Sequence, residues 1–367
     1  MDQGSEKQAL DQIEVIIPNL NWRYSGGTAV NRTIAPLVAK QCRAAWLGPH
    51  RPEGIRRLTL LDLLHLRFRH PKDQAVRIWH ARRNIEMVAG LVLKALGYRL
   101  GLIFNSAAQR QHRRLTDWLI ARMDAVIATS EMAAAYLKRP ATVIHHGIAI
   151  ETYCPPTDRL AAFAATGLPG KYGIGAFGRV RYQKGTDLFV EAMCRLLPRY
   201  SDFTAVIIGR ITAENQSFAE KLKQRVAAAG LSNRILLLGE LPIDDVPRWY
   251  QRIAIYVFAS RVEGFGLTLL ESMAAGNALV AARAGAAETV VADGETGVLT
   301  PVDDVEALVA ALEPLMRDPR RITAMGQRAR AEVVVRFSRD LEVDRIIAVY
   351  RQVWLALAPA GRGKPRG

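Results

Sequence analysis

Short apolar runs rich in Val, Ile, Phe and Ala alternate with helix-length segments along most of the chain. This alternation predicts parallel β-strands joined by crossover helices, which is the pattern of a doubly wound α/β fold. The chain has 367 residues, more than one hydrophobic core usually organises, so we expect two domains. In the first half the expected strands are 13–18, 76–80, 100–105, 124–129 and 142–146, with helices near 28–40, 84–96, 111–122 and 131–138.

A break in this pattern separates the two expected domains. Residues 151–171 contain three prolines and two glycines without a sustained strand pattern, which is typical of a linker. We therefore expect one Rossmann-like domain at 1–155, a second at 156–337, and a C-terminal helix in 338–367 that packs back towards the first. The remaining expected strands are 172–178, 203–209, 234–239, 253–259 and 277–282, and 303–357 reads as three helices.

The chain is strongly basic, with 50 Lys and Arg against 35 Asp and Glu and a net charge of +15. Residues 1–155 hold 22 of the basic and 12 of the acidic side chains, so most of the excess lies in the first half. A field of this sign attracts anions, and the candidates are nucleic acid, phospholipid head groups or a phosphorylated substrate. Composition does not choose between them.

Cysteine usage and hydropathy indicate the compartment. Cys42, Cys154 and Cys194 lie far apart and form no CxxC pair, which indicates neither a disulfide framework nor a thiolate zinc site. Residues 1–12 are polar, and no apolar run approaches the roughly 18 residues that span a bilayer. We expect a cytoplasmic protein without a membrane-spanning segment.

The segment GRVRYQKGTD, residues 178–187, follows an apolar strand and leads into a helix. Gly178 lets the backbone turn, and Arg179 and Lys184 then project from a loop where a diphosphate could lie, because both cations neutralise phosphate oxygens well. The alternative is a surface loop with two solvated cations.

A second segment, RVEGFGLTLLESMAAG, contains Glu263 and Glu271 on either side of a predicted helix start near Gly266. Carboxylates accept hydrogen bonds from sugar hydroxyls, and N–H groups at a helix start attract phosphate or sugar oxygens. The alternative is that Glu271 satisfies internal polar groups while Glu263 is solvated.

Together, GRVRYQKG and EGFGLTLLE resemble the donor signature of the retaining glycosyltransferase family 4, whose members have the GT-B fold of two doubly wound domains facing across a cleft. The segments SGGTAVNR, ATSEMAAAYL, HHGIAIETY, LGEL and AGAAETVVADGETGVL add to the resemblance in the same order, so it covers almost the whole chain. The resemblance implies that residues 1–155 bind the acceptor and that 156–337 bind a nucleotide sugar.

The resemblance also implies roles for single residues. Arg179 and Lys184 would hold the donor diphosphate and stabilise the leaving phosphate, and Glu263 would bind hydroxyls of the transferred sugar. Glu271 would bind the nucleotide ribose. The donor contacts implied by the resemblance are completed by Gly26, Gly27, Gly178, Gly264, Phe265, Gly266 and Leu267.

The first domain departs from the family pattern at one position. Many members have a His at the end of a first-domain strand, whereas this chain has Asn105 and Ser106 after LGLIF. His80 and Arg82, after the strand VRIWH, are therefore further candidates beside Asn105 for sugar or acceptor contacts, although a core histidine is an equal alternative for His80. No histidine has metal-ligand spacing, and the resemblance implies that protein cations act in place of a metal, so we expect no metal and no cofactor besides the donor substrate.

The stretch 56–72, RRLTLLDLLHLRFRHPK, interleaves leucines with cations. Such a segment can lie on an anionic bilayer, or it can be a buried element whose cations reach water. The sequence is most similar to bacterial lipopolysaccharide-core mannosyltransferases of the rhizobial type. This similarity implies GDP-mannose as donor, an anionic lipid-linked saccharide as acceptor, and a peripheral position on the inner face of the bacterial inner membrane.

Other functions fit the sequence less well. A transferase of the same family that uses a UDP-sugar and another lipid-linked or soluble acceptor remains the nearest alternative. A nucleic-acid-binding protein would need basic surfaces interleaved with aromatics, but aromatic residues make up 7% and no such module is present. A nicotinamide-dependent oxidoreductase would carry GxGxxG after its first strand, where this chain has SGGTAV.

Overall fold

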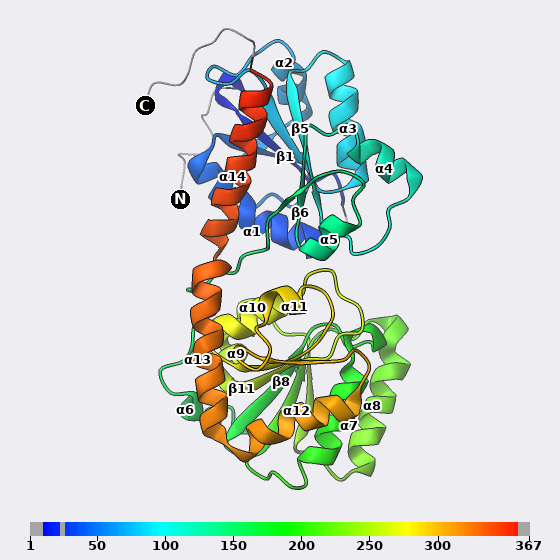
Figure 1. Cartoon of the computed structure of the whole chain (residues 1–367), viewed down its shortest axis with the longest axis vertical. Coiled ribbons are helices and arrows are strands. Elements are labelled where there is room, and N and C mark those ends of the chain that lie inside the picture. Colours follow the sequence, from blue (N-terminus) through cyan, green and yellow to red (C-terminus); the bar gives the residue numbers. More distant parts are fainter. Residues whose placement is uncertain (1–9, 23–25, 359–367) are drawn as a thin grey trace. The chain divides into compact units, whose positions relative to one another are not determined.

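The computed structural model describes residues 10–22 and 26–358 (Figure 1). They form two compact units. The first comprises the chain up to His145 together with the chain from Asp340 onwards, and the second is the continuous stretch His146–Arg339.

The first unit is built on a seven-stranded parallel sheet in the order β3-β2-β1-β4-β5-β6-β7. Most of its strands are apolar and buried along their whole length, as expected where helices cover both faces of a parallel sheet. The strands are β1 Val15–Pro18, β2 Ala44–Leu47, β3 Arg56–Leu58, β4 Arg77–Ala81, β5 Leu100–Ser106, β6 Ala125–Ala128 and β7 Thr142–Val143. The helices are α1 Gly26–Gln41, α2 Leu60–Leu66, α3 Asn84–Ala95, α4 Arg114–Ile120, α5 Glu131–Ala135 and α14 Arg339–Ala356.

Helix α14 completes the core of this unit although it comes from the far end of the chain. Its buried side chains include Ile346, Tyr350 and Trp354, which pack in one cluster with Ile78 and Ile103 of the sheet. A second apolar cluster is formed by other residues of the same sheet together with α2, α3 and α4. The sheet is therefore enclosed on both faces.

The second unit is built on a six-stranded parallel sheet in the order β10-β9-β8-β11-β12-β13. Strand order reverses between β8 and β11, which are adjacent in the sheet although β9 and β10 lie between them in the sequence. The strands are β8 Tyr172–Phe177, β9 Phe203–Ile208, β10 Ile235–Gly239, β11 Ile253–Phe258, β12 Ala278–Ala282 and β13 Val298–Thr300. The helices are α6 Arg159–Ala164, α7 Thr186–Leu196, α8 Gln216–Ala228, α9 Val246–Arg252, α10 Leu267–Ala274, α11 Ala287–Val290, α12 Val305–Arg317 and α13 Pro319–Arg336.

The prediction of two doubly wound α/β units is confirmed, and so are the three helices predicted for 303–357, which are α12, α13 and α14. Asp304 and Asp318 set the starts of α12 and α13, because their carboxylates accept hydrogen bonds from the first-turn N–H groups of Ala307 and Arg320. The strands β2, β3 and β13 were not predicted.

The first unit ends about ten residues before the predicted boundary at 155. Residues 146–155 pack with the second unit: Ile148 is buried in its core, and Arg330 donates to the carbonyl oxygens of Ile150 and Tyr153 at 2.8 and 2.9 Å. The Pro- and Gly-rich stretch that reads as a linker contains helix α6, which Asp158 caps. The composition therefore predicted where the chain turns, but not the residue at which it passes from the first unit to the second.

Candidate active site

The two motif loops of the second unit follow neighbouring strands. The loop from Gly178 to Gly185 follows β8, and the loop from Ala259 to Gly266 follows β11. In open α/β sheets ligands bind outside the carboxyl ends of the strands where strand order reverses, and β8 and β11 meet at that point. Topology therefore brings together two segments that lie about 80 residues apart.

Gly185 allows the two loops to touch. It has a φ of +65°, and a Cβ placed on it would lie 1.9 Å from the carbonyl oxygen of Ala259. A residue with a side chain would separate the loops. Backbone hydrogen bonding extends the contact, because the N–H of Arg261 donates to the carbonyl oxygen of Gln183 at 2.9 Å.

Lys184 and Glu263 form an ion pair between these loops, with both side chains partly buried. The other carboxylate oxygen of Glu263 accepts the N–H of Gly264 at 3.0 Å. The methylenes of Lys184 pass over Gly178, within 4 Å of where a Cβ would stand. Arg179 lies exposed on the same loop. The structure thus places a fixed cation, a second, exposed cation and a carboxylate on two loops in contact.

Glu271 lies on the second turn of α10, whereas Glu263 precedes the helix, as expected from the sequence. The Tyr250 hydroxyl donates to Glu271 Oε2 at 2.7 Å, and Tyr153 provides a second hydrogen bond. Burial raises the pKa of Glu271, although the two tyrosine hydrogen bonds and the charge of Lys184 oppose the shift. Glu271 is thus a carboxylate held in a fixed position on the helix that begins at the loop.

Phe265, Gly266 and Leu267 form the connection between the second loop and α10. Phe265 is 5% exposed and packs in the core, and Gly266 has a φ of +96° directly before the first residue of the helix. The carbonyl oxygen of Phe265 accepts the N–H of Ala286 at 2.9 Å. These contacts fix the start of α10, whose first N–H groups have no partner within the helix.

Two residues of this region were not identified from the sequence. Arg261 donates to both carboxylate oxygens of Asp187 at 2.8 Å, and it also pairs with Asp303 at 2.7 Å. Its guanidinium lies 3.7 Å from the centre of the Tyr182 ring. Both residues belong to the motif segments, because Asp187 ends the first motif and Arg261 comes two residues before Glu263. The sequence does not show that they pair, since the two opposite charges lie 74 residues apart.

Arg181 is the second of these residues. It lies between Arg179 and Lys184 in the chain, and its Nε is buried without a hydrogen-bond partner in the described part of the protein. Burial lowers its pKa, and the charge of Arg179 lowers it further, while Glu263 and Glu214 have the opposite effect. Arg181 therefore adds a third cation to the same loop.

The candidates of the first unit occupy two kinds of environment. Gly26 and Gly27 are the first residues of α1, directly after a gap in the described chain that includes Ser25.

His80 is 2% exposed, and its Nδ1 lies 2.7 Å from the Tyr350 hydroxyl of α14. Burial lowers the pKa of His80 well below its ordinary value, with a further contribution from the charge of Arg82. This is the environment of a core histidine, and a role for His80 in sugar binding stays a prediction.

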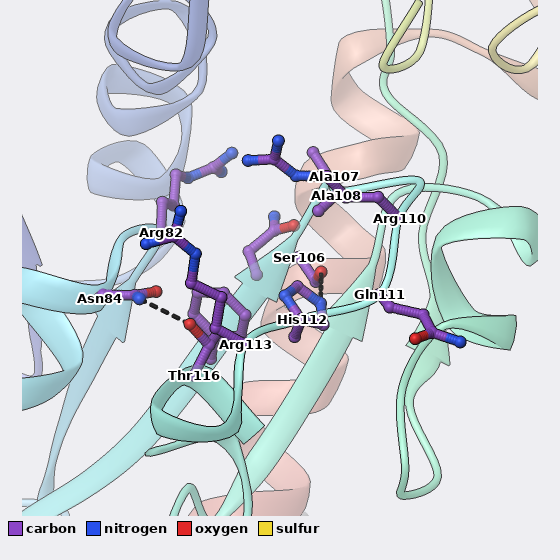
Figure 2. Close-up of a pocket in the computed structure, with 12 residues that line it drawn as sticks. Arg82, Asn84, Ser106, Ala107, Ala108, Arg110, Gln111, His112, Arg113 and Thr116 are labelled. Carbon is purple, nitrogen blue, oxygen red and sulfur yellow. Dashed lines mark hydrogen bonds between the residues drawn. The ribbon is translucent and has the colours of Figure 1, made fainter. Parts of the chain in front are cut away.

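Arg82 and Asn105 line one pocket of about 550 Å³ beyond the ends of β4 and β5 (Figure 2). Arg110, His112 and Arg113 line it from the following loop and the start of α4. The structure therefore brings two of the three predicted first-unit contacts together, and it adds basic residues that the sequence had indicated only as a general cationic surface.

Comparison with known proteins assigns the chain to a family. The model of the family described as glycosyl transferases group 1 matches residues 159–332, which include both motif loops and α10. The lipopolysaccharide core biosynthesis mannosyltransferase LpcC of Rhizobium leguminosarum bv. viciae is 48% identical over 346 residues, covering 93% of this chain and 97% of the relative. The chain belongs to the group 1 glycosyl transferases.

Two further proteins extend this result. The lipopolysaccharide core biosynthesis mannosyltransferase LpsB of Rhizobium meliloti (strain 1021) is 43% identical to this glycosyltransferase, covering 93% of the chain and 98% of the relative. The crystal structure of Anabaena HepE in complex with UDP has a TM-score of 0.80 at 19% identity and covers 93% of this chain and 100% of that one. The predictions of the GT-B fold and of glycosyltransferase activity are confirmed. Among the described residues, no helix of this glycosyltransferase is long and apolar enough to cross a membrane.

Proposed function

We propose that this glycosyltransferase is a retaining member of family 4 that transfers mannose from GDP-mannose to a lipopolysaccharide-core acceptor. One observation carries the proposal: Lys184 and Glu263 are paired at the point where strand order reverses, beside Arg179 and Glu271. Both rhizobial relatives, which match almost end to end, are named as lipopolysaccharide core mannosyltransferases, and this supports mannose as the sugar.

In this proposal the cations of the first loop bind the donor. Arg179 and Lys184 hold the diphosphate, and Glu263 accepts hydrogen bonds from hydroxyls of the mannose, which lies beside the N–H groups that begin α10. Glu271, held in a fixed position on α10, accepts hydrogen bonds from the hydroxyls of the ribose. The Lys184–Glu263 pair holds both side chains in place before the donor arrives, so the cost of ordering them during catalysis is small.

The reaction breaks the bond between the anomeric carbon and the β-phosphate oxygen and forms a bond from that carbon to the acceptor hydroxyl oxygen. We infer front-face attack, in which the hydroxyl enters on the side that the diphosphate leaves and the leaving phosphate takes its proton. Arg179 and Lys184 stabilise the negative charge that builds on this phosphate. Product NMR tests the stereochemistry, and an inverted anomeric centre would exclude this course.

Ligand binding tests the donor. In a thermal-shift series with GDP, UDP, GDP-mannose and UDP-glucose, we expect stabilisation by GDP and GDP-mannose, because a ligand that binds the folded state raises the melting temperature. Lys184→Ala should reduce the shift. A shift with UDP-glucose and none with GDP-mannose would replace our donor with the UDP-sugar alternative.

A surface on the first unit supports a membrane-bound acceptor. On the short helix α2, Leu60, Leu61 and Leu64 are 76%, 69% and 61% exposed, and Phe68 just beyond it is 77% exposed. The buried alternative considered for residues 56–72 therefore does not hold for these side chains, although Leu58 and Leu66 are buried. The cations around them are Arg57, Arg67, Arg69 and Lys72, all exposed. Exposed leucines with exposed cations close to them in the sequence suit the interface of an anionic bilayer, so we propose peripheral binding there.

Vesicle flotation tests this surface. We expect the protein to float with vesicles that contain anionic lipid and not with neutral vesicles. The double variant Leu61→Ser and Leu64→Ser should lose flotation, whereas Leu355→Ser, which replaces a leucine that is 70% exposed on α14, should keep it. Equal binding to neutral vesicles would remove the electrostatic basis of the proposal.

A further inference from the structure

The pocket shown in Figure 2 is lined by several basic residues of the first unit. It has a volume of about 550 Å³ and lies beyond the carboxyl ends of β4 and β5, the edge where ligands bind in doubly wound folds. Three arginines line it: Arg82 directly follows β4, and Arg110 and Arg113 belong to the segment between β5 and α4. Its lining contains no Asp or Glu.

The three guanidinium groups form no direct ion pair with an acidic side chain in the described part of the protein. Across residues 10–22 and 26–358, no side-chain hydrogen bond or salt bridge joins Arg82, Arg110 or Arg113 to an acidic residue, whereas the neighbouring Arg83 pairs with Glu86 at 3.0 Å. Burial lowers the pKa of Arg82, while the charges of Glu342 and Glu86 have the opposite effect. Positive charges that line one pocket without a direct ion pair repel one another, so an oxyanion between them would gain both electrostatic attraction and hydrogen bonds.

One residue that lines the pocket has a buried amide oxygen without a hydrogen-bond partner among the described residues. Asn105 is 5% exposed and lines the pocket, and its Oδ1 is buried without a hydrogen-bond partner among the described residues. An unpaired buried amide oxygen costs about 1–3 kcal/mol, and hydroxyl groups of a ligand are suitable partners for the amide. Other polar groups of the wall are already engaged, since Asn84 donates to Thr116 at 2.7 Å and His112 lies 3.5 Å from the Ser106 hydroxyl.

We propose that this pocket binds a negatively charged sugar of the acceptor, with Arg82, Arg110 and Arg113 on its oxyanion and Asn105 on a hydroxyl. The oxyanion is a phosphate monoester or a sugar-acid carboxylate, both of which match the planar fork of arginine. A bare anion would leave Asn105 unpaired, and a neutral sugar would leave the arginines unpaired. The inference rests on the proposed function for the identity of the reaction, but the pocket binds its ligand whichever donor is used.

Binding to the full-length protein tests the pocket directly. The donor site is first saturated with GDP, or with UDP if the thermal-shift series selects it, and saturation-transfer NMR is then recorded with glucose 6-phosphate, glucuronate and glucose. We expect a signal from at least one charged sugar and none from glucose. The double variant Arg110→Gln and Arg113→Gln should weaken that binding at least tenfold. Equal signals from glucose and the charged sugars, or unchanged binding by the variant, would overturn the proposal.

Arg114 provides a matched control. It follows Arg113 directly, is exposed and does not line the pocket. Arg114→Gln removes the same charge, so it should bind charged sugars like the wild type if the pocket, rather than the general field, is responsible. The replaced side chains of the double variant are exposed, so its melting temperature should equal that of the wild type, which separates lost binding from lost folding.

Kinetics separate this inference from the proposed function. In transfer to a lipopolysaccharide-core acceptor, the double variant should raise the KM for acceptor at least tenfold and leave the KM for donor and the slow hydrolysis of donor by water unchanged. A rise in the KM for donor instead would assign the arginines to the donor and refute the inference. If the wild type transfers no mannose at all, the proposed function fails, and the sugar-binding experiment still decides the role of the pocket.

Discussion

Lys184 and Glu263 are 79 positions apart, and each would be an ordinary charged loop residue without the other. Their pairing orders a cation beside the place where the proposed leaving group develops charge. Lys184→Ala and Arg179→Ala should each lower kcat by about 100- to 1,000-fold, the usual effect of removing one preorganised donor to an oxyanion. Steady-state transfer rates measure this loss.

The control for these two variants is Lys221→Ala, which removes an exposed cation from α8 of the same unit and should leave kcat unchanged. If Lys184→Ala raised the KM for donor with kcat intact, the lysine would bind substrate and transition state equally. Its assignment to the leaving phosphate would then be wrong.

Glu271 gives a pH dependence whose sign follows from its raised pKa. Below the ordinary value of 4.5 the carboxyl is protonated in both the folded and the unfolded chain. As pH rises above it, the unfolded chain loses this proton first, so ionisation lowers the free energy of unfolding until the folded pKa is passed. Glu271→Gln lacks this loss, and its free energy of unfolding relative to wild type should increase with pH over that window.

Urea unfolding of both proteins between pH 4 and pH 8 measures the difference in their free energies of unfolding. The test is how this difference changes with pH, because the amide also alters the hydrogen bonds from Tyr250 and Tyr153 by an amount that does not depend on pH. Glu220→Gln, at an exposed position on α8, controls for the substitution itself. A difference that falls as pH rises would mean that the hydrogen bonds outweigh burial and that the folded pKa is lowered.

At the scale of elements, Arg261 joins the loop after β8 to the loop after β11. It is not among the residues proposed to bind the diphosphate or the sugar. Its side chain is 10% exposed and forms a two-pronged pair with Asp187. Arg261→Ala should lower the free energy of unfolding by about 1–3 kcal/mol, since it leaves a partly buried carboxylate unpaired. It should also weaken donor binding, because Arg261 holds together the two loops that carry Lys184 and Glu263.

Arg283→Ala is the matched control, because Arg283 also pairs with two acids but is 41% exposed, and its loss should cost less than about 1 kcal/mol. Urea unfolding and titration with GDP give the two readouts. Wild-type affinity for GDP in Arg261→Ala would show that the loops keep their arrangement without this arginine.

What could be predicted from the sequence depends on how local the signal is. Strands β8 and β11 and the residues that follow them were predicted because long apolar runs and the motifs are local patterns. Strand β3 contains two arginines, and β2 and β13 are short apolar runs closely bounded by polar, Gly or Pro residues, so no sustained apolar run indicated them. The pairing of Arg261 with Asp187 and the convergence of Arg82 with Arg110 and Arg113 arise from strand order, which no local pattern specifies.

At the scale of the whole molecule, the two units differ in how the chain builds them. The second unit is one continuous stretch, whereas the first needs α14 from the far end of the chain. In the first core, α14 supplies Val343, Ile346, Ile347, Val349, Tyr350, Val353 and Trp354, all less than 9% exposed. At about 1.5–3 kcal/mol for each large apolar side chain, this contribution is comparable with the entire stability of a domain.

Separate expression of the units should therefore give unequal results. Residues 146–339 should unfold cooperatively and bind GDP, because their core clusters and both motif loops are complete. Residues 1–145 should lack cooperative unfolding and should regain it when a peptide of residues 340–358 is added, with circular dichroism and calorimetry as the measurements. Tyr350→Phe in that peptide should rescue less well, since it removes the hydroxyl that lies 2.7 Å from His80, at a cost of about 1 kcal/mol. Cooperative unfolding of 1–145 alone would show that α14 covers a core that is already stable.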